Sequence, residues 1–246
     1  MQTVSIDFIV PQAWHELSDK QLRFVYQLLS TDLSADEIKL LCLFRWSGTK
    51  VIGKQRSGAY LLKKGKILFE TTPLTLAEIL PHIAWLDSIP SVPVRISKIN
   101  RRPALPADFS EVPFETFIIC DNLYQGYLQT QNDELLDQLG STLYGKEITF
   151  KPYERISIFY WFVPLKDWMS RKYSDFFQPM ETATGGNLLA APSMNVEAAM
   201  NAQIRALTKG DITKEAEVLA LDTHRALVEL DAQAREYKEL KEKTSK

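Results

Sequence analysis

Histidine and cysteine are the residues of this 246-residue chain best suited to bind a metal ion or to act as a nucleophile. The three histidines, His15, His82 and His224, are widely separated, and none has a second histidine or cysteine at the spacing of a zinc site. Cys42 and Cys120 are expected on the apolar faces of helices, where a thiol packs as a small hydrophobic side chain. These patterns predict neither a metal site nor a catalytic thiol.

The sequence motifs that would signal other chemistry do not occur in the chain. It contains no GxSxG, HExxH, Walker loop or GxGxxG. Gly185-Gly186 is an isolated pair in a polar stretch, and the carboxylates of Asp133, Glu134 and Asp137 open a helix, where the helix dipole and solvent account for them. We therefore expect a protein without enzymatic activity, without catalytic residues and without a cofactor.

One segment of the chain is strongly basic. Eleven lysines and arginines but only three acids lie between Arg45 and Arg102, a local net charge of +8 in a chain of net charge −2. A patch of such side chains would neutralise phosphates, and Trp46 or Tyr60 could stack on bases. The alternative is that the cations solvate a small sheet, which the sequence pI near 6.0 favours. The candidate anion or nucleic-acid patch comprises Lys63, Lys64, Lys66, Arg95, Lys98, Arg101 and Arg102.

The composition indicates a soluble globular protein. Hydrophobic residues make up 45% of the chain, enough for a sizeable core. The start of the chain does not resemble a secretory signal, and its longest purely apolar run, Ile158–Val163, is far shorter than the roughly 20 residues of a membrane span. Two distant cysteines fit a reducing compartment. We expect a cytoplasmic protein that does not enter a membrane.

A six-residue pattern occurs three times, as LSDKQL, LSADEI and LTLAEI. In each copy a serine or threonine is followed three residues later by glutamine or glutamate, which is the spacing of a helix capping box. The flanking aliphatic residues stand where a hydrophobic staple forms. The pattern therefore predicts helix starts at Asp19, Ala35 and about Leu76, and it does not indicate a ligand site.

Alternating apolar residues predict the strands of the first half. Residues 3–10 alternate as a half-buried strand, and AYLLKKGKILF predicts a β-hairpin that turns at Gly65. VRISKI, residues 94–99, alternates as another strand and precedes a proline-rich connector.

The second half of the chain is expected to be helical. Two helices are predicted near residues 113–130 and 132–145, and EITF follows as a short strand. The next helix is apolar nearly all round at its centre, which indicates burial, and Pro164 must kink or restart it.

The C-terminal residues predict a helical hairpin behind a linker. The linker is ETATGGNLLAAPSMN, residues 181–195. Gly210 ends the first helix, and a longer helix begins at about Thr213. Apolar side chains at spacings of three and four residues form a narrow seam along both helices. The candidate partner-binding residues of this seam are Met200, Ile204, Leu207, Leu219, Leu227, Leu230 and Tyr237.

Together these elements define an α+β fold that is mainly α, with a helical domain, a small antiparallel β element and a C-terminal helical hairpin. The predicted regions are an N-terminal α+β region with the basic hairpin (1–112), a helical region packed on it (113–180), the linker (181–195) and the C-terminal hairpin (196–246). We expect the hairpin to dock on a partner protein or on a second copy, and docking on its own domain is the alternative.

Three stretches of the chain together resemble a known family. They are PQAWHELSDKQLRFVYQLLS, FYWFVPLKDWMSRKYSDFF and NAQIRALTKGDITKEAEVLALDTHRALVELDAQAREYKEL. They are similar to uncharacterised proteins encoded in tailed-phage and prophage gene clusters, near the tail genes. The resemblance implies a role in tail assembly, as a chaperone for the tape-measure protein or as a minor structural component, and it carries over no active site.

The sequence thus favours a non-enzymatic protein that acts through protein–protein interaction in the cytoplasm of the host cell or as part of the virion. Its expected partner is a tape-measure-like protein or a second copy of the chain. The alternative function is a nucleic-acid-associated module that uses residues 45–102, whose binding would weaken steeply as the salt concentration rises.

Overall fold

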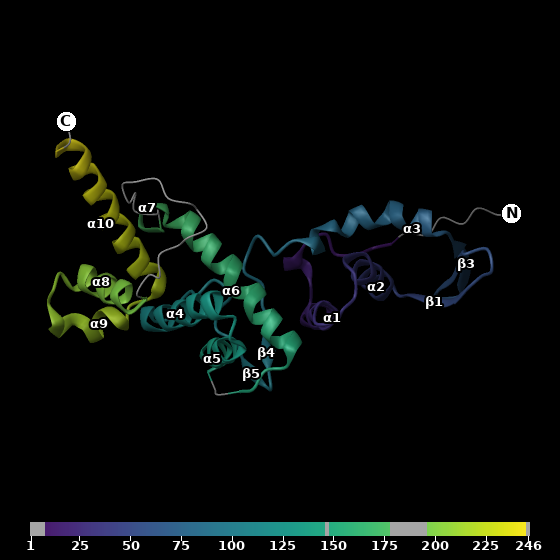
Figure 1. Cartoon of the computed structure of the whole chain (residues 1–246), viewed down its shortest axis with the longest axis horizontal. Helices are drawn as coiled ribbons and strands as arrows, with labels where there is room; N and C mark the ends of the chain where they lie inside the picture. Colours follow the sequence, from purple (N-terminus) through teal and green to yellow (C-terminus); the bar gives the residue numbers. More distant parts are fainter. Residues whose placement is uncertain (1–7, 146–147, 178–195, 245–246) are drawn as a thin grey trace. The chain divides into compact units, whose positions relative to one another are not determined.

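The computed structural model describes residues 8–145, 148–177 and 196–244, and for residues 196–200 it describes the backbone alone. The described chain is α+β and mainly α, with a small antiparallel sheet and a C-terminal helical pair, as the sequence predicts (Figure 1). Contacts divide the chain into two compact units. The N-terminal unit extends to Ser97 and includes Lys151–Trp161, and the C-terminal unit comprises Lys98–Phe150 and the chain from Phe162 onward.

This division differs from the predicted one, which placed boundaries at residues 112, 180 and 195. Helix α6 (Pro152–Lys172) contributes residues to both units, and it continues through Pro164 without the restart that the sequence suggested. The C-terminal helices belong to the same unit as residues 98–150 and do not form a separate region. The predicted linker, residues 181–195, lies outside the described residues.

Two helices of the N-terminal unit begin where their capping boxes predict. The Ser34 N–H donates to the Glu37 carboxylate at 2.9 Å, and the Glu37 N–H donates to the Ser34 hydroxyl oxygen at 3.4 Å. The Ser18 N–H donates to Gln21 Oε1 at 2.9 Å. The helical segments of this unit before α6 are η1 (Trp14–Glu16), α1 (Asp19–Leu29), α2 (Ala35–Ser47), α3 (Pro73–Ile79) and η2 (Leu80–Asp87).

The third predicted capping box is wrong. Helix α3 begins three residues earlier than expected, at Pro73, and its cap is Thr72, whose hydroxyl oxygen accepts the Thr75 N–H at 3.1 Å. Proline is favoured at the first position of a helix because its φ is already helical and its missing N–H is not needed there. Leu74 is consequently solvent-exposed and forms no staple.

The sheet of the N-terminal unit is a three-stranded antiparallel meander of order β1-β2-β3. The predicted hairpin around Gly65 is confirmed as β2 (Tyr60–Lys64) and β3 (Ile67–Thr71). A further strand, β1 (Thr49–Lys54), pairs with β2. It follows α2 directly, because Gly48 adopts a left-handed conformation (φ 71°) that ends the helix and turns the chain.

Aromatic side chains fill the core of the N-terminal unit. Trp14 stacks on Tyr26 at a centroid distance of 5.9 Å and meets Trp85 edge-on at 5.6 Å. Tyr160, from the first part of α6, lies 5.5 Å from Trp14 and 5.6 Å from Tyr26. The buried Trp14 Nε1–H donates to the carbonyl oxygens of Trp85 and Ser88. Trp14 therefore joins three parts of this unit.

The described residues of the C-terminal unit form helices and one very short strand pair. The predicted strand 94–99 is largely wrong, since only Lys98–Ile99 pairs, and residues 148–150 of the predicted EITF strand form none. The elements other than α6 are β4 (Lys98–Ile99), β5 (Arg102–Pro103), α4 (Phe114–Thr130), α5 (Asp133–Tyr144), α7 (Ser174–Phe177), α8 (Val196–Thr208), η3 (Ile212–Lys214), α9 (Glu215–Leu219) and α10 (Thr223–Thr244).

Main-chain hydrogen bonds join the start of α4 to the C-terminal helices. The Phe114 N–H donates to the Leu221 carbonyl oxygen at 2.8 Å, and the Thr223 N–H donates to the Val112 carbonyl oxygen at 2.8 Å. The helix predicted from Thr213 is therefore interrupted, because residues 220–222 bend to make these bonds. Helix α8 ends at Thr208, and Lys209 (φ 53°) is the left-handed residue that turns the chain, one position before the predicted Gly210 (φ 82°).

The buried Asp231 and the half-buried His224 fasten α10 to α7, to Tyr173 and to the loop before α4. One carboxylate oxygen of Asp231 accepts the N–H groups of Asp175 and Phe176, at 2.9 and 3.0 Å. His224 lies between the hydroxyl of Tyr173, at 2.8 Å from Nδ1, and the carbonyl oxygen of Asp108, at 2.7 Å from Nε2. The C-terminal helices thus satisfy polar groups that the rest of this unit would otherwise bury unpaired.

Candidate protein-binding surface

The histidines do not converge on a common site. His15 and His82 are solvent-exposed, whereas both ring nitrogens of His224 are engaged in the hydrogen bonds that fasten α10. Among the side chains that the structure describes, no group of three or more histidines, cysteines or acids is arranged to hold a metal ion.

Both cysteines are buried. Burial raises the pKa of the Cys42 thiol to about 12 and also raises the pKa of Cys120, because the thiolate loses its hydration. A nucleophilic cysteine has the opposite property, a lowered pKa and access to solvent.

We expect both thiols to be unreactive in the folded protein. A chromogenic disulfide reagent at mildly alkaline pH should label neither Cys42 nor Cys120, and it should label both after denaturation, because unfolding restores the hydration and ordinary pKa of each thiol. Stoichiometric labelling of either residue before unfolding would show that its side chain is accessible and would contradict the observed packing.

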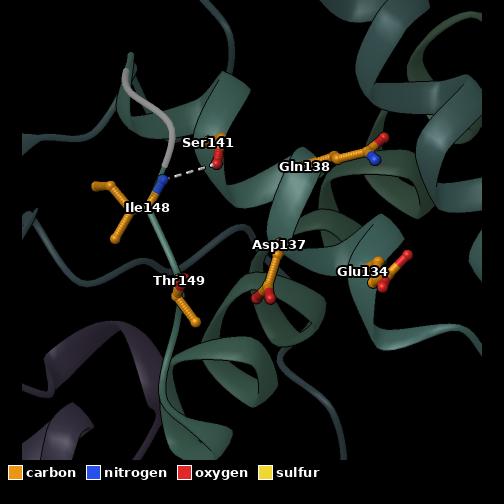
Figure 2. A pocket seen from close by; sticks show the side chains of 6 residues that line it. All are labelled: Glu134, Asp137, Gln138, Ser141, Ile148 and Thr149. Atoms are coloured by element: carbon orange, nitrogen blue, oxygen red, sulfur yellow. Dashed lines mark hydrogen bonds between the residues drawn. The ribbon is translucent and has the colours of Figure 1, made fainter.

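A hollow of about 430 Å³ lies beside α5. It is lined by Glu134, Asp137, Gln138, Ser141, Ile148 and Thr149. Figure 2 shows that these side chains point in different directions, and that the one interaction drawn is the Ile148 N–H donating to the Ser141 hydroxyl at 3.2 Å. The rim is solvent-exposed at Glu134 and Gln138. Two carboxylates and a hydroxyl that already accepts a hydrogen bond do not make a catalytic arrangement.

The structure does not bring the predicted anion patch together as one surface of one unit. Lys63, Lys64, Lys66 and Arg95 belong to the N-terminal unit, whereas Lys98, Arg101 and Arg102 belong to the C-terminal unit. These seven residues were predicted as one patch because they are close in the sequence. The boundary between the two units, after Ser97, divides them.

The aromatic residues that were expected to stack on bases are already engaged. Trp46 stacks on Trp85 at 6.0 Å with an interplanar angle of 6°, and Tyr60 lies beneath the Lys54 ammonium at 5.4 Å. The Arg95 guanidinium lies 5.8 Å from the Trp161 ring. These contacts occupy one face of the Trp46 and Tyr60 rings and hold Arg95 against Trp161.

The C-terminal seam is mostly covered by the chain itself. Ile204, Leu227 and Leu230 are buried, Leu207 and Leu219 are half-buried, and Tyr237 is exposed. The side chain of Met200 lies outside the described residues. We expected this seam to contact a partner. At its buried positions this expectation needs correction, because α4, α7 and α8 cover α10 there.

A different surface collects exposed aliphatic side chains. We call Thr49–Thr71, the three strands and their turns, the basic meander. Its exposed aliphatic residues, with the exposed fraction of each, are Val51 (51%), Ile52 (52%), Ile67 (46%) and Leu68 (59%). Only Leu62 of its apolar side chains is fully buried. Sequence reasoning missed this surface, although a hairpin with aliphatic residues in consecutive positions was a signal that both faces of the sheet are apolar.

The strand register assigns these side chains to the two faces of the sheet. Val51, Leu62 and Phe69 are directly paired and share the face that is partly covered. Lys63 and Leu68 are paired on the opposite face, which we call the outer face, together with Lys50, Leu61 and Glu70. All of the outer-face residues except the half-buried Leu61 are exposed.

The charge of the basic meander is strongly one-sided. Its cations are Lys50, Lys54, Arg56, Lys63, Lys64 and Lys66. Glu70 is its only acid, so the local net charge is +5. Glu70 also accepts a hydrogen bond from the side-chain amide of Gln55. Exposed aliphatic side chains surrounded by positive charge are typical of an interaction surface. Lysines alone would be enough to keep the sheet solvated, so solvation does not account for the exposed aliphatic residues.

None of the helices in the described part of the chain combines the length and the apolar character that a transmembrane span requires. Comparison with protein-family models, with characterised proteins and with solved structures finds no match to the chain.

Proposed function

We propose that the protein is a non-enzymatic assembly or structural protein of the tailed-phage and prophage type, and that it acts by binding another protein through the basic meander. The observation that carries the proposal is the set of four exposed aliphatic side chains on a sheet of net charge +5. The resemblance to proteins encoded near tail genes supports a tape-measure-like partner, and this role belongs in the host cytoplasm or on the virion.

Two observations support a role without covalent chemistry. The cysteine thiols are buried and their pKa values are raised, so they are poor nucleophiles. His224 is held between Tyr173 and Asp108 as part of the fastening of α10. The two thiols and His224 therefore serve the fold.

The surface chemistry favours a protein partner over a nucleic acid. Single-stranded nucleic acids bind where aromatic rings stack on bases along a basic groove. The exposed apolar residues of the basic meander are instead aliphatic, and Trp46 stacks on Trp85 within the unit. Burying aliphatic side chains in a protein interface contributes roughly 25 cal/mol per Å² of apolar area.

Co-expression with the tape-measure protein of the same gene cluster, followed by affinity purification, tests this function. We expect the two proteins to purify together at moderate salt, because apolar contacts are not screened. Repeated recovery of this chain alone would contradict the proposal. Tight binding to DNA or RNA that weakens steeply with salt would instead support the nucleic-acid alternative.

A further inference from the structure

The two edge strands of the basic meander differ in how well they are protected. An exposed sheet edge pairs readily with another strand unless lysines, prolines or bulges block it. Strand β1 has such protection: its register shifts between Val51 and Gly53, and it carries Lys50 and Lys54. β1 is therefore poorly suited to accept another strand.

Strand β3 forms the other edge of the sheet (Figure 1). It lacks these devices. Its five residues pair with β2 without a register shift. Ile67, Leu68 and Phe69 give it an apolar sequence, and none of its residues is lysine or proline. A regular, apolar edge of this kind is a template for strand addition.

The hairpin geometry indicates which main-chain groups of β3 point away from β2. Gly65 and Lys66 form a two-residue turn in which Gly65 has φ 59°, as a type II′ turn requires at its first central position. The closing pair of such a hairpin exchanges both backbone hydrogen bonds, and exchanging and non-exchanging pairs then alternate. The N–H and C=O groups of Leu68 and Glu70 consequently point outward.

Charge decides which occupant suits this edge. Pairing β3 with β3 of a second copy would join two sheets that each carry a net charge of +5, and this repulsion disfavours self-association. An acidic segment would instead place carboxylates near Lys63 and Lys66, which neighbour Leu68 across the strand and along it. Aliphatic residues of the same segment would cover Ile67 and Phe69 on the partly covered face.

We propose that the edge of β3, which carries no further strand within the described residues, binds an extended acidic segment of a partner protein as a fourth strand, with the outward main-chain groups of Leu68 and Glu70 as its hydrogen-bonding partners. The inference rests on the proposed function, since it names the part of a protein partner that the basic meander recognises. Alternation of acidic and aliphatic residues is the sequence property that this edge selects.

Two synthetic peptides probe the edge directly. One alternates valine and glutamate, and the other has lysine in place of glutamate. Amide NMR of the full-length chain should show that the glutamate peptide slows hydrogen exchange at Leu68 and Glu70, because their N–H groups become bonded. The lysine peptide should bind about tenfold more weakly or not at all, since it meets the same positive field.

Three variants test which groups are used. Leu68→Pro removes an outward N–H without removing a hydrogen bond to β2. It should lower the affinity for the glutamate peptide by about tenfold to a hundredfold. Leu68→Ser keeps the N–H and loses the aliphatic side chain, so it should have a smaller effect. Val228→Ser, on α10 at a residue whose exposure (57%) is close to that of Leu68 (59%), is the matched control and should bind as the wild type does.

Several outcomes would overturn the proposal. They are protection of β1 amides in place of Leu68 and Glu70, equal binding of the lysine peptide, and an unchanged affinity in Leu68→Pro. A dimer in sedimentation that Leu68→Pro dissociates would identify a second copy as the occupant. If neither peptide binds while the tape-measure protein still purifies with the chain, the proposed protein binding is kept and β3 is not its site. If neither peptide binds and the tape-measure protein does not purify with the chain, the proposed function is wrong as well.

Discussion

A chain that ends at Met180 is expected to lose the folded C-terminal unit. The truncation removes α8, α9 and α10, including the buried side chains of Leu227 and Leu230, each of which stabilises the fold by about 1.5 to 3 kcal/mol. It also leaves the Phe114 N–H without its acceptor and removes Asp231 from the start of α7. These losses together approach the roughly 5 to 15 kcal/mol by which domains are stable.

The truncated chain should therefore be poorly soluble or melt well below the full-length protein in circular dichroism. A chain that ends at Glu236 is the matched control, since it removes only exposed residues of α10 and should melt as the full-length protein does. A chain ending at Met180 that stays soluble with an unchanged melting temperature would mean that the C-terminal helices are dispensable for the fold, which is the behaviour of a hairpin presented to a partner.

Trp14→Ala should be the most damaging single substitution in the N-terminal unit. The ring contacts Tyr26, Trp85 and Tyr160, and its N–H satisfies two carbonyl oxygens. Truncating a buried tryptophan to alanine costs about 3 to 5 kcal/mol, since a cavity remains where the ring was.

Urea unfolding followed by circular dichroism measures this effect. Trp14→Phe should cost less than Trp14→Ala, because it keeps a ring and loses only the N–H. Ile9→Ala, at a side chain that is 85% exposed, should change stability by no more than about 0.5 kcal/mol. Equal stability of Trp14→Ala and the wild type would show that the aromatic cluster does not support this unit.

Helix ends were predictable from the sequence where neighbouring residues determine them. Ser18 and Ser34 cap helices as expected, and α8 ends within one residue of the predicted position, because a cap involves residues within one turn. Thr75 failed as a cap, although it has the same local pattern, since Pro73 starts the helix earlier.

The arrangement of the C-terminal helices was not predictable in the same way. The interruption before Thr223 arises from hydrogen bonds with residues 112–114, more than a hundred positions away in the sequence. Helical periodicity carries no information about such partners. It therefore identified a seam but could not decide whether this chain or another covers it.

The candidate site was predicted only in part. Lys63, Lys64 and Lys66 do lie on the basic meander, but the sequence grouped them with Arg95 and with residues of the other unit. The exposed aliphatic residues were missed because the exposure of a strand residue depends on whether another layer covers that face of the sheet. The strand register assigned the side chains to the two faces, and the solvent exposure of each side chain showed which of them are uncovered.

Co-purification with paired surface variants tests most directly whether the basic meander binds a protein. The double variant Ile52→Ser/Leu68→Ser removes exposed aliphatic side chains from the meander, and Val228→Ser/Leu240→Ser removes side chains of similar exposure from α10. Each is co-expressed with the proposed tape-measure-like partner, after circular dichroism confirms that the variant is folded. We expect the meander variant to lose the complex and the α10 variant to keep it. Loss of the complex in the α10 variant alone, or its persistence in both, would contradict the assignment of the binding surface to the basic meander.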